Sequence, residues 1–224
     1  MTPAVTAVLL LALLLPWRPA WAAYAELVVF GDSLSDTGNL ASLTIIDFPW
    51  PYYENRVSNG PLAVDVLAAQ LGLSAEASLH LGFASGGGNF AVDGAKAAGD
   101  DAEDLVWQQQ AHLAREGGTA IANALYVVMI GGNDLRDARN RDSTAAAVAI
   151  VDAAVASIRQ LLRTLLQLGA QKLLVVNAPD IGRIPETLQK AQQDPAIIQR
   201  STLLSQRFNA LLAAEIETLR QLHG

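Results

Sequence analysis

Short apolar runs alternate along the chain with longer segments in which apolar residues recur at helical spacing. The run 125–130 is apolar without alternation, which is typical of a strand buried on both faces, and 172–176 is predicted as another buried strand. A further strand is predicted over 26–30. Helices are predicted over about 61–71, 102–115, 144–168 and 196–222. Strands spaced by helices predict an α/β protein with a central parallel sheet and helices on both faces.

Local signals bound the first predicted helix. Pro61 follows Ser58-Asn59-Gly60 and is expected at the first helical position, and Gly72 is expected to end the helix. The apolar stripe of this helix is expected to consist of Leu62, Val66, Leu67 and Leu71.

Composition narrows the classes of function. The chain has 224 residues, 51% hydrophobic and 17% charged, which is enough apolar surface for the core of one domain. The formal charge of −7 gives no electrostatic reason to bind nucleic acid or an anionic membrane surface. The absence of cysteine excludes disulfides, thiolate zinc sites and cysteine nucleophiles. Asp and Glu are scattered, so no metal site is expected.

The N-terminus has the pattern of a secretory signal peptide. An apolar run over 5–15 is followed by Pro16 and then by Ala20-Trp21-Ala22, a small-residue cleavage pattern. The run is too short to span a bilayer. We therefore expect cleavage after Ala22, which leaves a secreted or periplasmic domain over 23–224 without a membrane span. An uncleaved anchor or a mis-assigned start are the alternatives, because no Lys or Arg precedes the run.

Three polar loops follow, or lie near, the ends of apolar runs, over 31–33, 86–89 and 131–134. Because the carboxyl ends of parallel strands meet at one edge of a sheet, we expect these loops to converge. Ser33 is a candidate nucleophile, and glycine N–H groups with the Asn133 amide are suitable donors to an oxyanion. On the residues alone, a turn serine, a plain glycine turn and a helix cap remain open as alternatives.

The same loops carry the motifs of a known family. Residues 30–39 read Phe-Gly-Asp-Ser-Leu-Ser-Asp-Thr-Gly-Asn, residues 87–95 read Gly-Gly-Asn-Phe-Ala-Val-Asp-Gly-Ala, and residues 131–134 read Gly-Gly-Asn-Asp. With the supporting segments 55–61 and 176–182, the chain resembles the bacterial GDSL, or SGNH, ester hydrolases and lipases. The resemblance implies a flavodoxin-like, three-layer α/β/α fold. It also implies hydrolysis of a small-molecule or lipid ester without a metal or cofactor.

The resemblance further implies roles for single residues. Ser33 matches the nucleophile, and its backbone N–H would be one oxyanion donor. Gly87 matches the glycine whose N–H is the second donor, and Asn133 matches the asparagine whose side-chain amide is the third. Asp32 and Asp36 belong to the first motif and are expected to hold the turn.

The chain departs from the family pattern at two points. Asp93 stands where relatives usually have a small residue, a loop change that we expect to be tolerated. The family keeps its histidine base in a C-terminal Asp-x-x-His block, and none of His80, His112 and His223 has Asp three positions earlier. We expect His112 at the surface or boundary of its helix, and the C-terminal part of the fold to be missing. The alternative to an active ester hydrolase is an inactive, truncated or decayed homologue that at most binds an ester or acyl ligand.

Overall fold

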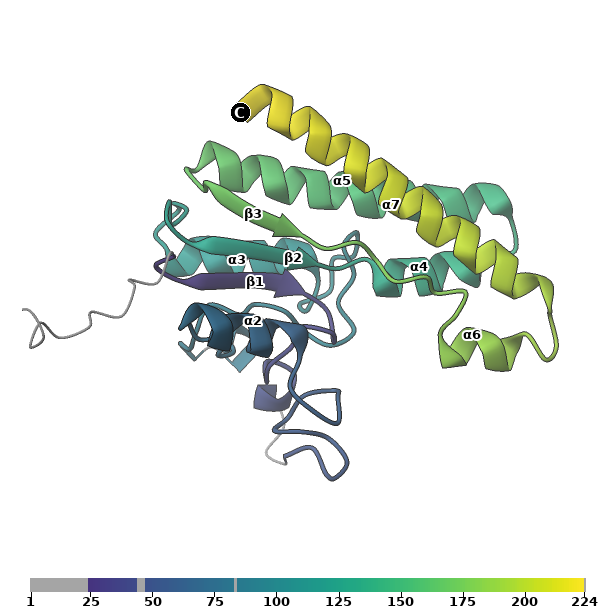
Figure 1. Cartoon of the computed structure of the whole chain (residues 1–224), viewed down its shortest axis with the longest axis horizontal. Coiled ribbons are helices and arrows are strands. Elements are labelled where there is room, and N and C mark those ends of the chain that lie inside the picture. The colour runs from purple at the N-terminus through teal and green to yellow at the C-terminus, as the bar shows by residue number, and fades with distance from the viewer. Residues whose placement is uncertain (1–23, 44–46, 83, 224) are drawn as a thin grey trace, which may run out of the picture.

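The apolar runs form one sheet in the computed structural model, which describes residues 24–43, 47–82 and 84–223 (Figure 1). The strands are β1 (Leu27–Gly31), β2 (Leu125–Met129) and β3 (Lys172–Val175). They are parallel and lie in the order β1-β2-β3, so the predicted parallel sheet is confirmed. The predicted signal peptide over 1–22 lies outside the described residues.

Helices cover both faces of this sheet (Figure 1). Alternate residues of β1 face opposite layers: Leu27 and Val29 pack with α2, whereas Val28 and Phe30 share a core with α3, α5 and α7. The expected three-layer α/β/α fold is therefore confirmed. The helices are α2 (Ala63–Leu71), α3 (Leu105–Arg115), α4 (Gly132–Arg139), α5 (Thr144–Gln167), α6 (Pro185–Lys190) and α7 (Ala196–His223), with the short 3-10 helices η1 (Ala41–Leu43) and η2 (His80–Gly82).

The long helix α5 illustrates how local signals and packing agree. Ser143 caps its start, because the Ser143 hydroxyl accepts a hydrogen bond from the Ala146 N–H. Past its end, Gly169 adopts a φ of +104°, which favours glycine. By length and composition α5 could cross a membrane, but one face, including Val151 and Leu165, is buried in the protein core. This burial is the arrangement of a core helix.

A fourth segment, 88–92, extends the sheet beyond β1 without forming a regular strand. The Val29 N–H donates to the Gly88 carbonyl (3.0 Å), and the Phe90 N–H donates to the Val29 carbonyl (2.8 Å). Further along, the Val92 N–H donates to the Gly31 carbonyl (3.2 Å). The segment therefore runs parallel to β1, and the residues that follow it emerge at the same edge as the loop after β1.

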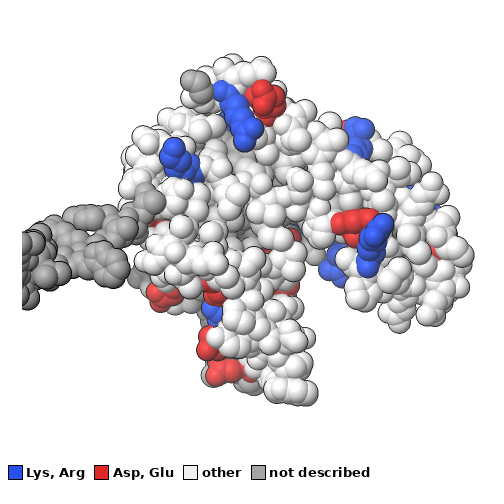
Figure 2. Space-filling view, viewed as in Figure 1, with Lys and Arg blue, Asp and Glu red and all other residues white. Residues whose placement is uncertain are grey.

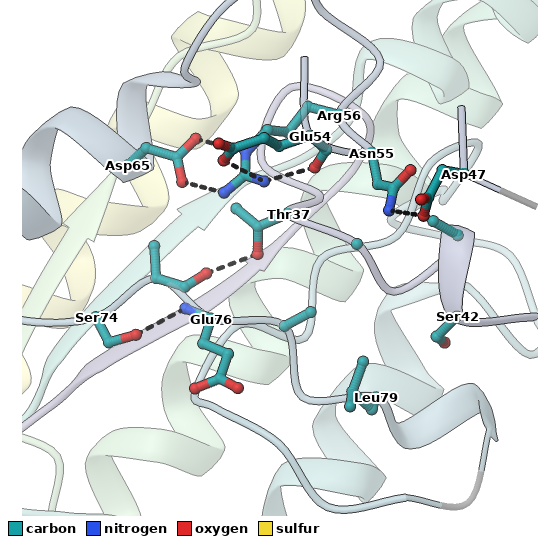
Figure 3. Close-up of a pocket in the computed structure, with 14 residues that line it drawn as sticks. Thr37, Ser42, Asp47, Glu54, Asn55, Arg56, Asp65, Ser74, Glu76 and Leu79 are labelled. Atoms are coloured by element: carbon teal, nitrogen blue, oxygen red, sulfur yellow. Dashed lines mark hydrogen bonds and ion pairs between the residues drawn. The ribbon is translucent and has the colours of Figure 1, made fainter. Parts of the chain in front are cut away.

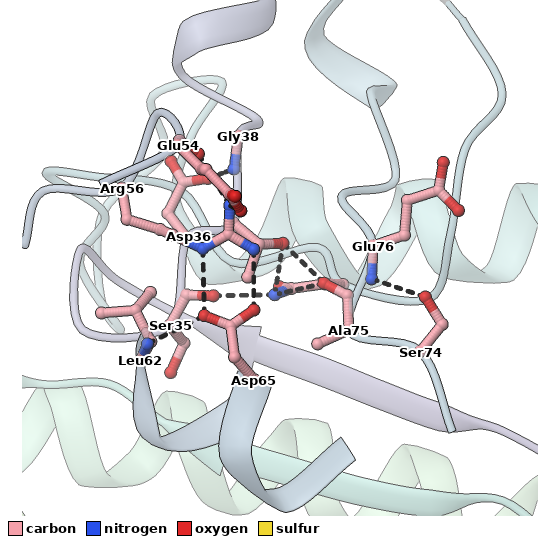
Figure 4. A network of polar contacts seen from close by, with 12 residues as sticks. Ser35, Asp36, Gly38, Glu54, Arg56, Leu62, Asp65, Ser74, Ala75 and Glu76 are labelled. Carbon is pink, nitrogen blue, oxygen red and sulfur yellow. Dashed lines mark hydrogen bonds and ion pairs between the residues drawn. The ribbon is translucent and has the colours of Figure 1, made fainter. Parts of the chain in front are cut away.

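The start of α2 differs from the prediction. Leu62 is the N-cap residue, so Pro61 lies one residue before the cap rather than at the first helical position. The Asp65 carboxylate accepts the Leu62 N–H (2.8 Å) and two hydrogen bonds from the Arg56 guanidinium (Figure 4). Asp65 thus satisfies a free N–H at the helix start and also anchors the preceding loop.

The buried face of α2 also differs from the expected stripe. Val64 and Ala68 are buried, whereas Val66 is 48% exposed. Residues 64 and 68 lie four positions apart, on the side of the helix that packs on the sheet. The prediction for Val66 was wrong because the side that faces the sheet depends on how α2 docks.

Two expectations about the second half of the chain also need correction. The prediction that β3 is a buried strand is wrong, since its residues are exposed or half-buried and Leu174 is 41% exposed. β3 pairs only with β2 among the described residues, so it is an edge strand. The helices α4 and α6 were not predicted, because each is short and rich in polar residues.

Charged side chains are sparse on the face shown in Figure 2, where acidic and basic residues form small separate groups. Many surface charges pair with an opposite charge, as in the ion pair between Arg207 and Asp152 (2.8 Å). The face has no large patch of one sign, in line with the composition.

His112 on α3 is fully buried, so its expected place at the surface or boundary of the helix is wrong. Its ring makes edge contacts with the rings of Phe30, Phe90 and Tyr126, at centroid distances of 5.5–5.6 Å. Neither ring nitrogen has a hydrogen-bond partner among the described residues. Burial, with a smaller contribution from the nearby Arg115 charge, lowers the pKa of His112 from 6.5 to about 4.

The neutral His112 makes stability depend on pH. Between pH 6.5 and about 4 the unfolded chain binds a proton that the folded chain does not, so the contribution of His112 to stability falls as the pH falls. The full loss is about 3 kcal/mol. We expect His112→Leu to remove this dependence. Urea unfolding of wild type and His112→Leu at about pH 7.5 and about pH 4.5 gives the difference between their free energies of unfolding at each pH. The effects of other titrating groups cancel in that difference. An unfolding free-energy difference that is the same at both pH values would contradict the prediction.

Candidate active site

The loop after β1 carries Ser33. Gly31 closes the strand, and Gln108 of α3 binds its backbone on both sides, accepting its N–H (2.9 Å) and donating to its carbonyl (2.8 Å). This buried side-chain bridge fixes the point at which the chain leaves the sheet. Ser33 follows two residues later in a turn and is only half-buried. The nucleophile candidate therefore lies at the carboxyl end of the first strand, within reach of solvent.

Asp32 ties this turn to the neighbouring loop. The side chain is buried, its carboxylate accepts the N–H of Leu34 (3.0 Å), and it lies against Gly132, the first residue of α4. Burial raises the pKa of Asp32 to about 6, and the N–H groups of Leu34 and Gly132 oppose that rise. Asp32 thus connects the loop after β1 with the loop after β2.

Asp36 holds the rest of the turn. Its carboxylate accepts the backbone N–H groups of Gly38 (2.8 Å), Asn39 (2.6 Å) and Leu40 (3.1 Å), and the first of these contacts is drawn in Figure 4. It also accepts the N–H of Asp93 (2.9 Å), which lies on the segment that follows 88–92. One buried carboxylate therefore joins two loops that are far apart in the sequence.

Two buried asparagines complete this join. The Asn39 amide donates to the carbonyls of Asn89 and Ala91, both at 2.8 Å. In return the Asn89 amide donates to the Ser35 carbonyl (2.7 Å) and to the Thr37 hydroxyl (3.0 Å). These amides satisfy backbone groups that have no strand partner, which explains why the motif contains buried asparagines here.

Asp93 lies directly beside Ser33. Burial, followed by repulsion from Asp36, raises the pKa of the Asp93 carboxyl, whereas the Gly94 N–H, the Ser33 hydroxyl and the Arg136 charge act against the rise. The residue that departs from the family pattern is thus a direct neighbour of the candidate nucleophile.

Asn133 lies in the first turn of α4, at the same edge. Its amide nitrogen donates to the Ala95 carbonyl (2.9 Å), and its amide oxygen accepts a hydrogen bond from Arg136 (3.1 Å). The next residue, Asp134, is buried and accepts the Ala97 N–H (2.8 Å). The loops after β1, after segment 88–92 and after β2 therefore converge.

Gly87 does not lie with these groups. Its N–H donates to the Ala77 carbonyl (2.8 Å), and its carbonyl accepts a hydrogen bond from Arg115 of α3 (2.7 Å). It precedes segment 88–92 and so lies at the amino end of β1, whereas Ser33 follows the carboxyl end. The glycine of this motif that lies beside the Ser33 turn is Gly94. Its φ is +82°, and no neighbouring heavy atom lies within 4 Å of the position that a Cβ would take. The assignment of Gly87 as a donor needs this correction.

None of the three histidines, all of which lie in the described part of the chain, contacts Ser33. The His80 ring binds the Ser78 hydroxyl (2.6 Å) and lies against Phe90. His112 is enclosed among aromatic rings. His223 lies at the end of α7, beside the exposed edge strand β3. No histidine in this arrangement can take the Ser33 proton directly.

A polar pocket lies beside the loop that follows Ser33 (Figure 3). Its walls come from the loops around η1 and on either side of α2, and Ser33 is not among its lining residues. The Arg56 guanidinium in its wall is already paired with Asp65 (2.7 Å) and lies 3.8 Å from Glu54. The pocket therefore offers no unpaired Arg56 charge to an anionic ligand.

The fold and the gathered loops define an α/β protein with a serine at the carboxyl end of its first strand. The model of the family described as GDSL-like Lipase/Acylhydrolase matches residues 27–224. The chain therefore belongs to this family, as its motifs predicted.

Curated relatives agree with this membership. Lipase 1 of Photorhabdus luminescens is 35% identical over 169 residues, covering 75% of this chain but 24% of the relative. A GDSL esterase/lipase of Arabidopsis thaliana is 27% identical over 235 residues, covering 87% of this chain and 67% of the relative. The phosphatidylcholine-sterol acyltransferase of Aeromonas hydrophila is 28% identical over 204 residues, covering 87% and 54%. The chain thus spans about a quarter of the first relative and about half of the third.

The contribution of the buried Asn39 to the contact between the two loops can be measured as a change in the free energy of unfolding. Asn39→Ala removes an amide that is fully buried and leaves the carbonyls of Asn89 and Ala91 without these donors. We expect the free energy of unfolding to fall by about 2–4 kcal/mol, because each buried unsatisfied group costs about 1–3 kcal/mol. Asn59→Ala changes an exposed asparagine and should have little effect. Equal denaturant midpoints for the two variants would show that the join adds nothing.

Proposed function

We propose that the chain hydrolyses carboxylic esters with Ser33 as the nucleophile. The observation that carries this proposal is the half-buried Ser33 at the edge of the sheet where its loop meets the loops that hold Gly94 and Asn133. Family membership supports ester hydrolysis as the class of reaction. A small-molecule or lipid ester is the proposed substrate.

The proposed reaction follows from the groups at this edge. The Ser33 hydroxyl oxygen attacks the ester carbonyl, and negative charge develops on the carbonyl oxygen. Three donors would stabilise that charge: the N–H of Ser33, the N–H of Gly94 and the side-chain amide of Asn133. Gly94 replaces Gly87 as the second backbone donor to the oxyanion. The amide of Asn133 already lies at the carbonyl of Ala95, the residue next to Gly94.

The second candidate is an inactive homologue that only binds an ester or acyl ligand. The lack of any contact between Ser33 and the three histidines favours this candidate. A serine without a proton acceptor is a weak nucleophile. The two candidates differ in whether ester turnover depends on Ser33.

Hydrolysis of p-nitrophenyl esters distinguishes the two candidates. We expect wild type to exceed Ser33→Ala by about 10³-fold or more in kcat, because the hydroxyl forms the acyl intermediate. Ser85→Ala changes an exposed serine and should match wild type. A comparison of the rates with acetyl, butyryl and longer acyl esters would show the preferred acyl chain length. Equal background rates from folded wild type and Ser33→Ala would favour the inactive homologue.

The corrected set of donors predicts a kinetic signature for Asn133. Asn133→Ala removes the amide donor, and we expect kcat to fall by about 10²–10³-fold with KM nearly unchanged, because the donor acts on charge present only in the transition state. Asn140→Ala, at the other end of α4 and exposed, is the matched control. A rise in KM at constant kcat would show that Asn133 binds substrate in the ground state instead.

A further inference from the structure

The side-chain amide of Asn133 has one N–H group that the protein does not use. Its oxygen accepts a hydrogen bond from the Arg136 guanidinium (3.1 Å), and its nitrogen donates to the Ala95 carbonyl (2.9 Å). A primary amide has two N–H donors, and no acceptor for the second is recorded among the described residues. This unused N–H is the donor that the proposed reaction needs at the oxyanion.

The orientation of this amide decides whether the donor is available. The terminal torsion of an asparagine is broad, and a half-turn exchanges the amide nitrogen with its oxygen, which cannot donate. Arg136 selects one orientation, because a guanidinium has only donors and therefore binds the amide oxygen. We propose that Arg136 is a positioning residue that fixes the Asn133 amide with its unused N–H available to the oxyanion. This inference rests on the proposed ester hydrolysis and deepens it.

A second contact holds Arg136 itself in place. Its Nε donates to one carboxylate oxygen of Glu186 on α6 (2.8 Å), while its Nη1 donates to Asn133. Arg136 and Asn133 lie three positions apart on α4, so their side chains share one face of the helix. The planar guanidinium is thus bound at two points, which sets the direction of the donor that reaches Asn133.

The buried Arg139 anchors Glu186 in turn. Its guanidinium donates to the other carboxylate oxygen of Glu186 and to the Thr187 hydroxyl (2.6 Å). The Thr187 hydroxyl donates to the Ile181 carbonyl, which ties this group to the chain before α6. An isolated exposed ion pair contributes little, but a network anchored on a buried side chain restricts all its members. One carboxylate therefore connects both arginines of α4 and holds α6 against that helix.

The charges near Arg136 define what a test must separate. Burial acts to raise the pKa of the Glu186 carboxyl, but the hydrogen bonds and charges of Arg139 and Arg136 lower it overall, so Glu186 is a carboxylate at neutral pH. The Arg136 charge also acts to lower the pKa of Asp93 in the loop beside Ser33. A substitution of Arg136 therefore changes the charge near Ser33 as well as the contact with Asn133.

Two substitutions at position 136 separate the hydrogen bond from the charge. Arg136→Met loses both, whereas Arg136→Gln loses the charge but keeps an N–H donor that can reach an asparagine three positions away on a helix. With a p-nitrophenyl ester we expect kcat to fall by about 10-fold or more in Arg136→Met, with KM nearly unchanged, and to stay within about 3-fold of wild type in Arg136→Gln. Arg163→Met, at an exposed arginine of α5, is the matched control, and circular dichroism checks the fold of each variant.

Two further measurements show whether Arg136 acts through Asn133. Once Asn133→Ala has removed the amide, adding Arg136→Met should cause little further loss of kcat, so the two effects should not add. NMR of the Asn133 side-chain amide does not depend on turnover, and its cross-peaks are identified by their loss in Asn133→Ala. The heteronuclear NOE should show a rigid amide in wild type and in Arg136→Gln, and a more mobile amide in Arg136→Met.

Several results would overturn the proposal. Equal losses of kcat in Arg136→Met and Arg136→Gln, with a rigid amide in both, would show that the charge acts through space. Additive losses in the double variant would show that Arg136 acts independently of Asn133. An amide as rigid in Arg136→Met as in wild type would show that the Ala95 carbonyl alone holds it. A wild-type rate equal to that of Ser33→Ala would reject the proposed ester hydrolysis, while the NMR comparison would still decide whether Arg136 fixes the amide.

Discussion

The parallel pairing of segment 88–92 with β1 is the constraint on which the rest of the site depends. Only three backbone hydrogen bonds connect the two directly, through Val29 and Gly31. They nevertheless decide which residues emerge together at the carboxyl end of the sheet. With this register, Asp93 and Gly94 lie beside Ser33, while Gly87 lies a strand's length away. A shift of one residue would exchange the two buried sides of the segment, so that Ala91 would face the core layer that now holds Phe90 and Val92.

Buried polar side chains form the hydrogen bonds to backbone groups that a neighbouring strand would form in a regular sheet. Asn39, Asn89 and Asp36 bind backbone groups that the irregular loops leave without partners. Because unpaired buried polar groups are costly, such side chains select one arrangement of the loops. The motif residues near Ser33 are therefore structural in large part, and they position a small number of reactive groups.

The concentration of carboxylates at this edge gives the site its chemical character. Repulsion from Asp36 contributes to the raised pKa of Asp93, repulsion from Asp93 contributes to the raised pKa of Asp32, and backbone N–H groups oppose both rises. Membership in the GDSL-like lipase/acylhydrolase family supports ester hydrolysis as the class of chemistry. The particular residue at position 93 makes this chain differ from the pattern that its motifs first implied.

The sequence by itself determined the strands, the longer helices, the parallel sheet and the place of Ser33 and Asn133 after their strands, because these follow from local periodicity and turn signals. Only the tertiary structure decided which glycine of the 87–95 motif lies beside Ser33, since that depends on register against β1. It also decided that His112 is enclosed by rings from three other segments and that β3 is an edge strand. These features arise from contacts between residues far apart in the chain, which local patterns do not encode.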